Sequence, residues 1–316
     1  MSIDPKFLNL FVKATEKAAI GASKFIGKKD KIAADKGAVD PMRRELNKIN
    51  MEGTIVIGEG EMDEAPMLYI GEKIGSGGNI DIDIAVDPLE GTNFVANDLP
   101  GALSVIAIAE KGNLFNAPET YMDKLAVSNK IPFDATDLDF PVEKNIKNIA
   151  DSLNKDISDI TACLLDRPRH QKIIDKLKDL NVKIKLISDG DVSGALLVTN
   201  QKYTVDIFLG IGGGPEGVLA ASAIDAYNCK FQGRFLFENE KDKSRAKKMG
   251  IKDLKKKYDL KEIIKGDSIF CATGITTGDI VKGIDIKDNK YITETLATHK
   301  NSNMCKIITR EDTIKT

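Results

Sequence analysis

Apolar positions along the first 50 residues follow a helical spacing. They recur every three or four positions, at Phe7, Leu10, Phe11, Ala14 and Ala18, with Lys and Glu between them. This spacing is typical of an amphipathic helix packed against a core. The segment has no continuous apolar block and therefore does not resemble a signal peptide. We predict a helical N-terminal region.

After residue 50 the pattern changes to short apolar runs, which predict β-strands. The runs are TIVIG, IDIDIAV and LSVIAIAEKG in the first half, and ITACLLD, VKIKLIS and TVDIFLG in the second. A polar, poorly periodic stretch separates the two sets at about residues 130–150. Strands that alternate with helices in both halves predict a layered α/β protein. We expect an N-terminal metal-site domain over residues 1–140 and a C-terminal substrate-binding domain over residues 141–316. Residues 238–265 are dense in charge, which indicates a solvated helix face.

Several of the predicted strands end in acidic residues close to glycines. Acidic residues follow TIVIG at Glu59, Glu61, Asp63 and Glu64, and follow IDIDIAV at Asp87 and Glu90. Strand ends are where α/β proteins place their chemistry. If the two strands are neighbours, these carboxylates converge, and a bound divalent cation would remove their mutual repulsion. Oxygen-only ligation suits Mg²⁺ or Mn²⁺, ions that serve phosphoryl transfer.

Each acidic segment also has a purely structural interpretation. In DPLE, Asp87 suits a helix N-cap and Pro88 the first helical position. Against this, Gly91 follows at once and we expect no amphipathic helix before Pro100. GEGEMDEAP could be a solvated turn that leads to a helix around MLYIGEKIG. Both interpretations stay open on the residues alone.

The segment FLGIGGGPEG matches the dinucleotide-binding pattern GxGxxG at Gly212, Gly214 and Gly217. Its position late in the chain leaves little room for a two-halved nucleotide domain, and Glu216 would put an anion where a pyrophosphate must lie. We expect instead a tight turn that presents Glu216 to a metal.

Two further segments suit a phosphorylated sugar. SDGDVSGAL places Asp189 and Asp191 at a strand end, where they could accept hydrogen bonds from vicinal hydroxyls or cap a helix. DRPRH supplies Arg167 and Arg169, whose planar guanidinium groups suit phosphate, although surface arginines are an equal alternative.

Composition narrows the possible functions. The 316 residues include 46 basic and 48 acidic ones, for a net charge of −2, which favours neither nucleic acid nor an anionic membrane. Only two histidines are present, so a histidine-rich zinc site is hard to assemble. Four scattered cysteines predict reduced thiols and a cytoplasmic location. No apolar stretch approaches the length of a membrane span.

In combination, six segments resemble a known family. They are GEGEMDEAPMLYIGEKIG, DPLEGT, APETYMDKL, PRH, DGDV and GIGGGPEG, and they resemble the class II (GlpX-type) fructose-1,6-bisphosphatases. That family belongs to the lithium-sensitive sugar phosphatases and is related to the inositol monophosphatases. The resemblance implies a layered α/β/α/β/α fold with two α/β halves. It also implies hydrolysis of the 1-phosphate of fructose-1,6-bisphosphate in gluconeogenesis. We expect a homo-oligomer, a dimer or tetramer.

The resemblance also implies roles for individual residues. Asp35 and Glu59 would hold one divalent ion, Mn²⁺ or Mg²⁺, and Asp87, Glu90 and Glu216 another. Thr92, with Asp35, would orient the attacking water. The implied substrate contacts are Glu90, Gly91, Thr92, Tyr121, Arg167, Pro168, Arg169, Asp189, Gly190, Asp191 and Gly213.

Three alternatives remain at this point. An inositol phosphatase is disfavoured by the long family-specific segments. A sedoheptulose-1,7-bisphosphatase stays open, because one extra carbon changes few necessary contacts. A non-catalytic sugar-phosphate sensor is disfavoured because every proposed metal carboxylate and Thr92 are present.

Overall fold

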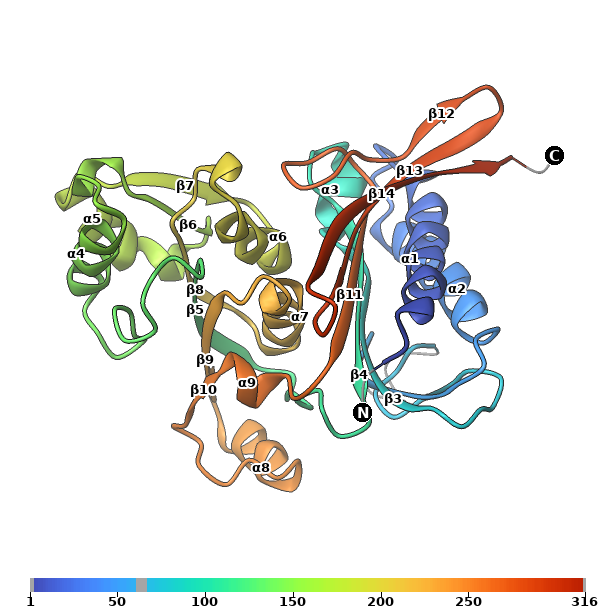
Figure 1. The fold of residues 1–316 in the computed structure, drawn as a ribbon, viewed down its shortest axis with the longest axis horizontal. Coiled ribbons are helices and arrows are strands. Elements are labelled where there is room, and N and C mark those ends of the chain that lie inside the picture. Colours follow the sequence, from blue (N-terminus) through green and yellow to red (C-terminus); the bar gives the residue numbers. More distant parts are fainter. Residues whose placement is uncertain (1–2, 61–66, 315–316) are drawn as a thin grey trace. The chain divides into compact units, whose positions relative to one another are not determined.

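Two units, each with its own β-sheet, make up the computed structural model, which describes residues 3–60 and 67–314 (Figure 1). Unit 1 comprises Met1–Phe115 and Ile264–Thr316, and unit 2 comprises Asn116–Ile263. The predicted α/β class is confirmed in both units. The expected boundary at residue 140 does not coincide with this division, because residues 116–140 belong to unit 2 and residues 264–316 return to unit 1.

Strand pairing and polar contacts explain the different boundary. The C-terminal segment contributes strands to the sheet of unit 1, where Phe270 pairs with Ala107. The polar stretch around residues 130–150 lies inside unit 2 instead of between domains. Within it, the Asp137 carboxylate forms an ion pair with Lys257, and the Asn145 side-chain oxygen accepts a hydrogen bond from the Asp137 amide at 2.9 Å. The polar stretch is therefore part of the folded structure of unit 2 and is not a linker between two domains.

The sheet of unit 1 has eight strands among the described residues, in the order β12-β13-β11-β4-β3-β1-β2, with β14 paired to β13. Strands β1 and β3 are parallel, whereas the pairs β3·β4, β4·β11 and β11·β13 are antiparallel. Helices α1 and α2 cover one face of this sheet (Figure 1). The elements are α1 Leu8–Ser23, α2 Lys31–Leu46, β1 Glu52–Ile57, β2 Lys73–Ile74, β3 Asp81–Glu90, α3 Thr92–Asn97, β4 Leu103–Glu110, β11 Ser268–Gly274, β12 Asp285–Lys287, β13 Lys290–His299 and β14 Met304–Thr313.

The sheet of unit 2 has six strands among the described residues, in the order β10-β9-β5-β8-β6-β7. Helices α4 and α5 pack against one face, and α6 and α7 lie on the other (Figure 1). The elements are β5 Tyr121–Val127, α4 Val142–Leu153, β6 Thr161–Leu165, α5 Gln171–Asp179, β7 Lys183–Ile187, α6 Asp191–Leu196, β8 Ile207–Gly213, α7 Gly214–Asp225, β9 Lys230–Leu236, α8 Glu240–Lys248, β10 Lys257–Asp259 and α9 Leu260–Ile263.

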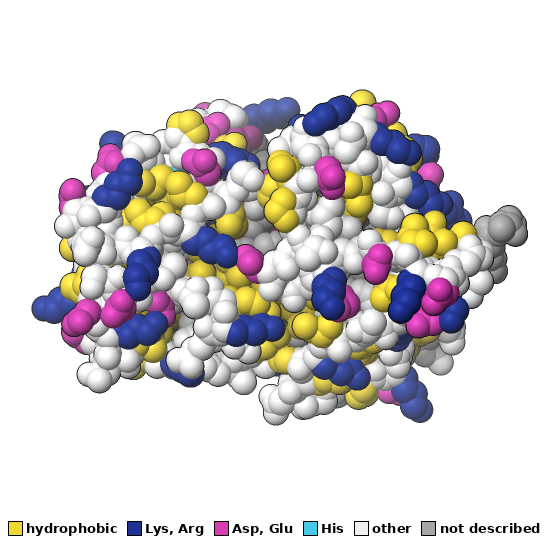
Figure 2. Space-filling view, turned by 90° about the horizontal axis from the view of Figure 1, so that it is seen from above, with side chains coloured by type: hydrophobic (Ala, Val, Ile, Leu, Met, Phe, Trp, Pro, Cys, Tyr) yellow, Lys and Arg dark blue, Asp and Glu magenta, His cyan; other side chains and the backbone are white. Residues whose placement is uncertain are grey.

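The helical N-terminal region and all six predicted strands are confirmed, the strands as β1, β3, β4, β6, β7 and β8. The helix suggested around residues 67–75 is wrong, since turns and the short strand β2 occupy the described part of that segment. The charged stretch 238–265 contains the solvated helix α8, but also β10 and α9. Basic and acidic side chains are intermixed on the face seen in Figure 2, in keeping with the small net charge.

Two other expectations concern the cysteines and membrane insertion. All four cysteines are free thiols, and three of them are buried. Among the residues that the structure describes, no helix is both long enough and apolar enough to cross a membrane.

Helices α1 and α2 approach each other closely at two glycines. A Cβ atom added at Gly21 would lie 1.9 Å from the carbonyl oxygen of Gly37, which is too near for any side chain. Asp30 caps the start of α2 by accepting a hydrogen bond from the Ala33 amide at 2.9 Å. The cap and the close contact together fix the position of α2, the helix that carries Asp35.

We predict that Gly21→Ala destabilises the protein. In an exposed helix this change would stabilise by about 1 kcal/mol, but here the methyl group overlaps backbone and should cost about 1–3 kcal/mol. Urea unfolding measures the difference. Lys13→Ala on the same helix is the control, because Lys13 is exposed and forms only a surface pair with Glu45 at 3.5 Å; we expect a change of less than about 1 kcal/mol. A Gly21→Ala protein as stable as the wild type would show that the two helices do not depend on this contact.

Candidate active site

Two adjacent parallel strands of unit 1 carry the predicted carboxylates at their ends. In the β1·β3 ladder, Ile57 pairs with Ala85. Glu59 comes two positions after Ile57, and Asp87 comes two positions after Ala85. Both carboxylates therefore lie at the same edge of the sheet. The condition on which the sequence argument depended, that these two strands are neighbours, is therefore met.

Asp35 joins this edge from helix α2. Its carboxyl group is within hydrogen-bonding contact of the Glu59 carboxyl group. Burial raises the pKa of Asp35 above its ordinary value of 3.8, and the contact with Glu59 only partly offsets that effect. Two carboxyl groups can form a hydrogen bond only if one carries a proton. A divalent cation could take the place of that proton, and the all-oxygen donor pair fits such an ion.

The segment DPLEGT forms the end of β3 and the first residue of a short helix. The Asp87 carboxylate accepts a hydrogen bond from the Leu89 amide at 3.0 Å, and Glu90 is only 4% exposed. Gly91 has a φ of +85°, a conformation that favours glycine, and a Cβ atom there would lie 2.7 Å from the Phe94 ring. The Thr92 hydroxyl donates to the Leu89 carbonyl at 3.3 Å.

This geometry decides between the two interpretations of DPLE. Asp87 is not a helix N-cap, because β3 continues to Glu90 and helix α3 begins only at Thr92, after Gly91. A short helix, α3, does precede Pro100, at Thr92–Asn97, but it is not an amphipathic helix capped by Asp87. The side chains that α3 buries are Phe94, Val95 and Ala96, a run too short to show helical periodicity.

Three of the acidic residues predicted at the end of β1 cannot be placed. Glu61, Asp63 and Glu64 lie outside the described residues. Within the described ranges, no group of three or more His, Cys, Asp or Glu side chains is gathered so as to hold a metal ion. Unit 1 thus contributes the contacting pair Asp35 and Glu59, with Asp87 on the neighbouring strand.

In unit 2, the predicted arginines are held by backbone carbonyls at the ends of strands. Arg167 donates to the Ser188 carbonyl at 2.5 Å and lies 3.5 Å from the Asp189 carboxylate. Arg169 donates to the Ile211 carbonyl at 2.9 Å, and its guanidinium carbon lies 4.9 Å from the centre of the Tyr121 ring. The tyrosine, which sequence alone would assign to packing, is thus a platform for an arginine.

The loop that carries these arginines, which includes Pro168, is anchored by a histidine that the sequence analysis missed. His170 is fully buried; its Nδ1 lies 2.7 Å from the Leu165 carbonyl, and its Nε2 accepts a hydrogen bond from the Ile211 amide at 2.8 Å. Because a carbonyl can only accept, Nδ1 must carry the proton. A histidine close to two phosphate-binding candidates in DRPRH was the available sequence signal.

The glycine-rich segment forms the predicted tight turn between β8 and α7. Tyr121 pairs with Gly213 across the β5·β8 ladder. A Cβ atom at Gly213 would lie 1.8 Å from a carboxylate oxygen of Glu216, so only glycine leaves room for that side chain. Tyr121, Gly213 and Glu216 line one cavity of about 290 Å³. No dinucleotide geometry is needed to explain the glycines.

Charge is concentrated around Glu216. Burial raises the pKa of Glu216; the nearby Lys124 ammonium opposes this shift, and the carboxylates of Asp191 and Asp189 add to it. Asp191 follows Gly190 as the first residue of α6, and Lys124 pairs with it. Lys124 was also missed by the sequence analysis, where its only signal was a lysine within the apolar run YMDKLAV.

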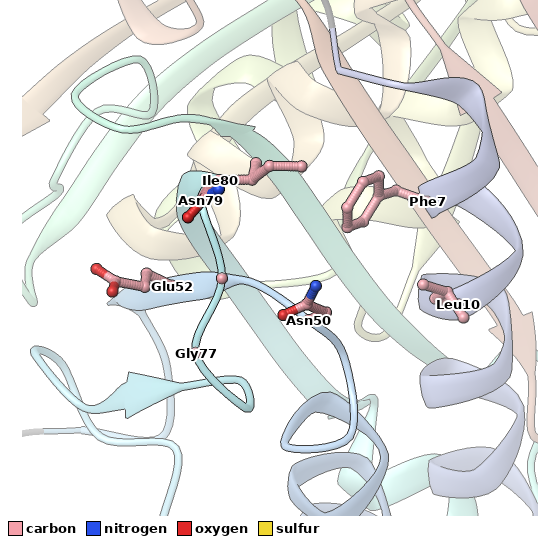
Figure 3. Close-up of a pocket in the computed structure, with 8 residues that line it drawn as sticks. Phe7, Leu10, Asn50, Glu52, Gly77, Asn79 and Ile80 are labelled. Atoms are coloured by element: carbon pink, nitrogen blue, oxygen red, sulfur yellow. The ribbon is translucent and has the colours of Figure 1, made fainter.

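A separate cavity of about 740 Å³ in unit 1 holds none of the predicted site residues (Figure 3). Phe7 and Leu10 lie on one side of it, and the segment around Asn79 and Ile80 lies on the other. It also contacts Glu52, the first residue of β1, whereas Glu59 follows the end of that strand. The cavity therefore lies at the opposite end of β1 from the carboxylates.

The candidate site residues accordingly form two sets, each described within its own unit. Unit 1 carries those of α2 and of the ends of β1 and β3. Unit 2 carries the arginine loop, the β7–α6 turn and the β8–α7 turn. The first set is Asp35, Glu59, Asp87, Glu90, Gly91 and Thr92; the second is Tyr121, Arg167, Pro168, Arg169, Asp189, Gly190, Asp191, Gly213 and Glu216.

Comparison with known proteins identifies the family. The family model described as bacterial fructose-1,6-bisphosphatase, glpX-encoded, matches residues 6–312. The chain is 43% identical over 300 residues to "Fructose-1,6-bisphosphatase 1 class 2" of Escherichia coli (strain K12), covering 90% of this chain and 89% of that protein. It is 40% identical over 322 residues to "D-fructose 1,6-bisphosphatase class 2/sedoheptulose 1,7-bisphosphatase" of Synechococcus sp. (strain JA-2-3B'a(2-13)), covering 94% and 92% of the two chains.

A solved structure, the inositol monophosphatase from Anabaena (Nostoc) sp. PCC 7120, is similar at 16% identity and a TM-score of 0.33, covering 61% of this chain and 71% of that one.

Carboxylates, arginines and a threonine hydroxyl at strand ends fit a phosphatase. The chain belongs to the class 2, GlpX-type fructose-1,6-bisphosphatase family, and the resemblance seen in the sequence is confirmed.

We predict that Asp35→Asn stabilises the metal-free protein at pH 7. The pKa of Asp35 is raised in the folded state, so the unfolded state ionises first as the pH rises above 3.8. In the wild type, the contribution of Asp35 to the free energy of unfolding is fully present below pH 3.8. It is lost as the pH rises toward the raised pKa of the folded state. Asparagine does not ionise and avoids that loss.

Urea unfolding in EDTA at pH 4 and pH 7 measures the effect. Asp40→Asn is the control, because Asp40 lies on the same helix and forms a surface pair with Lys36 at 3.1 Å. We expect that control to change stability by less than about 1 kcal/mol. A wild type that loses no more stability than Asp35→Asn between the two pH values would contradict the raised pKa.

Proposed function

We propose that this chain is a metal-dependent phosphatase that hydrolyses the 1-phosphate of fructose-1,6-bisphosphate to give fructose 6-phosphate and inorganic phosphate. Family membership over residues 6–312 supports the reaction. The observation that carries the proposal is the contact between the Asp35 and Glu59 carboxyl groups, beside β3, which ends at Glu90 of DPLEGT. Carboxyl groups held this close need a proton or a cation between them.

Divalent cations are the proposed cofactors. Asp35 and Glu59 would hold one Mn²⁺ or Mg²⁺ ion. Asp87 and Glu90 in unit 1, and Glu216 in unit 2, are the further candidate metal ligands. Their donor atoms are all carboxylate oxygens, which both ions accept. When bound, such ions neutralise charge that develops on a transferring phosphoryl group and promote ionisation of water.

The protein's own residues would bind and orient the reactants. The Thr92 hydroxyl and the Asp35 carboxylate would align a water with the 1-phosphoryl group. Arg167 and Arg169 would contact phosphate oxygens with their planar guanidinium groups. Asp191 would accept hydrogen bonds from sugar hydroxyls, with Asp189 beside it.

Three backbone positions are also proposed substrate contacts. Gly91 and Gly190 lie at the turns after β3 and β7, and Gly213 is the last residue of β8. Gly91 and Gly190 have φ values of +85° and +93°. At such turns glycine lets the backbone approach a bound molecule closely.

Sedoheptulose-1,7-bisphosphate is the second candidate substrate, because the Synechococcus relative carries both activities in its name. Parallel kcat/KM measurements on the two bisphosphates decide between them. We expect the six-carbon substrate to be preferred. A higher kcat/KM for the seven-carbon sugar would overturn that assignment.

The reaction itself is tested by phosphate release from fructose-1,6-bisphosphate with and without added Mn²⁺ or Mg²⁺. We expect release that depends on the metal and stops in EDTA. Wild-type protein that releases no phosphate with either metal would refute the enzyme and favour a sugar-phosphate sensor.

We predict that Thr92→Ala lowers kcat by about 10²-fold or more while substrate still binds, because misplacing a reacting water removes orientation without removing phosphate contacts. Thr92→Ser retains the hydroxyl and should keep part of the activity. Steady-state kinetics give kcat, and calorimetric titration with fructose 6-phosphate gives binding. An Ala variant with wild-type kcat would rule out a role for the hydroxyl.

We further propose a cytoplasmic location and a homo-oligomer. The four free thiols support a reducing compartment. Sedimentation equilibrium on the purified protein measures the mass, and a monomer at micromolar concentration would contradict the oligomer.

A further inference from the structure

Lysine is rarely buried in proteins, yet Lys124 lies at 0% exposure in the middle of β5. Its strand neighbours Leu125 and Val127 belong to the apolar core that α4 and α5 cover. Side chains two apart on a strand share a face, and neighbouring ones point to opposite faces. Lys124 therefore points away from that core, toward the face on which α6 and α7 lie (Figure 1).

The ammonium group of Lys124 is bound to a predicted substrate residue. Its Nζ donates to Oδ2 of Asp191 at 2.5 Å, and Asp191 is only 6% exposed. On its other side, the Asp191 carboxylate lies against β8, since a Cβ atom at Gly212 would be 2.0 Å from the same Oδ2 and 2.6 Å from Oδ1. The carboxylate is thus fixed between a lysine and a strand backbone.

The stem of Lys124 also supports the turn that carries Glu216. A Cβ atom at Gly217, the residue after Glu216, would lie 3.3 Å from Cε of Lys124. The side chain therefore passes beneath the first turn of α7 and places one positive charge close to both Glu216 and Asp191. The proximity of its charge to Glu216 agrees with the opposing effect of Lys124 at that carboxyl group.

A gain in folding stability does not by itself explain the buried ion pair between Lys124 and Asp191. A buried ion pair loses much of its attraction to desolvation, and apolar side chains of similar volume often fill the same space at least as stably. What the pair does provide is a single orientation for the Asp191 carboxylate. That orientation matters if Asp191 accepts hydrogen bonds from a sugar.

We propose that Lys124 is a positioning residue for substrate binding: it fixes Asp191 through Oδ2, so that Oδ1 accepts a hydrogen bond from a sugar hydroxyl. The inference rests on the proposed function, because it takes Asp191 as a substrate contact. Lys124 itself does not touch the substrate. Its effect is exerted through Asp191 and, by charge, on the turn at Glu216.

Lys124→Met tests the role, because methionine fills similar space without the charge. We expect KM for fructose-1,6-bisphosphate to rise at least about tenfold, the loss of one hydrogen bond to a charged group, while kcat falls less. The residues proposed to orient water, Thr92 and Asp35, are unchanged by this substitution.

Lys230→Met is the matched control. Lys230 is also a buried lysine of the same sheet, but its ammonium donates to the carbonyls of Phe133 and Thr136. It pairs with Val127, at the opposite end of β5 from Tyr121. Both variants remove a buried charge and should lower Tm, but only Lys124→Met should raise KM. Equal KM values in the two variants would overturn the proposal.

A double variant distinguishes positioning of Asp191 from a general loss of structure around the substituted lysine. If Lys124 acts through Asp191, adding Lys124→Met to Asp191→Asn should raise KM little beyond Asp191→Asn alone. Fully multiplicative effects would contradict the proposal. If Lys124→Met does not fold, Lys124→Gln takes its place. Glutamine keeps a hydrogen-bond donor, so this variant should have a KM between that of the wild type and that of Asp191→Asn. A wild-type KM for Lys124→Gln, together with a raised KM for Asp191→Asn, would refute the positioning role of Lys124.

Failure of the proposed function gives a different result. In that case the wild type itself releases no phosphate. Calorimetric binding of fructose 6-phosphate then tests the positioning role directly, with weaker binding in Lys124→Met than in Lys230→Met expected, and equal binding against it.

Discussion

Repulsion between carboxylates is the constraint on which the functional parts of this structure depend. In unit 1, Asp35 and Glu59 are in contact at the end of β1. In unit 2, Asp191 and Glu216 lie in the first turns of α6 and α7, and the charge of Asp191 adds to the raised pKa of Glu216. Like charges this close disfavour ionisation unless a positive charge lies between or beside them. Lys124 supplies such a charge beside Asp191 and Glu216, and we attribute the corresponding role beside Asp35 and Glu59 to a divalent cation.

Backbone geometry makes these close approaches possible. The parallel pairing of β1 and β3 places Glu59 and Asp87 at one edge of the sheet. Gly91 turns the chain through a left-handed conformation directly before Thr92. Gly213 leaves room for the Glu216 carboxylate, which a Cβ atom would displace. Glu216 thus depends on a turn that only glycine can form, whereas Glu59 and Asp87 depend on the pairing of their strands.

The parts of the fold and site that depend on local pattern could be predicted from sequence. Apolar runs predicted β1 and β3, and the glycines of FLGIGGGPEG predicted the turn at Glu216. The return of the chain to unit 1 could not be predicted, because β11 pairs with β4 across a long separation in sequence. Lys124 and His170 were missed for the same reason. Their partners, Asp191 and Ile211, are distant in sequence and become neighbours only through the pairing of β5, β8 and β6.

Calorimetric titration of the metal-free protein with Mn²⁺ tests the central claim most directly. If converging carboxylates form a cation site, wild-type protein binds Mn²⁺ saturably, and Glu59→Gln, which replaces one carboxylate of the contacting pair with an amide, loses at least one equivalent of binding. Saturable binding that is unchanged in Glu59→Gln, or no binding to the wild type, would contradict the account.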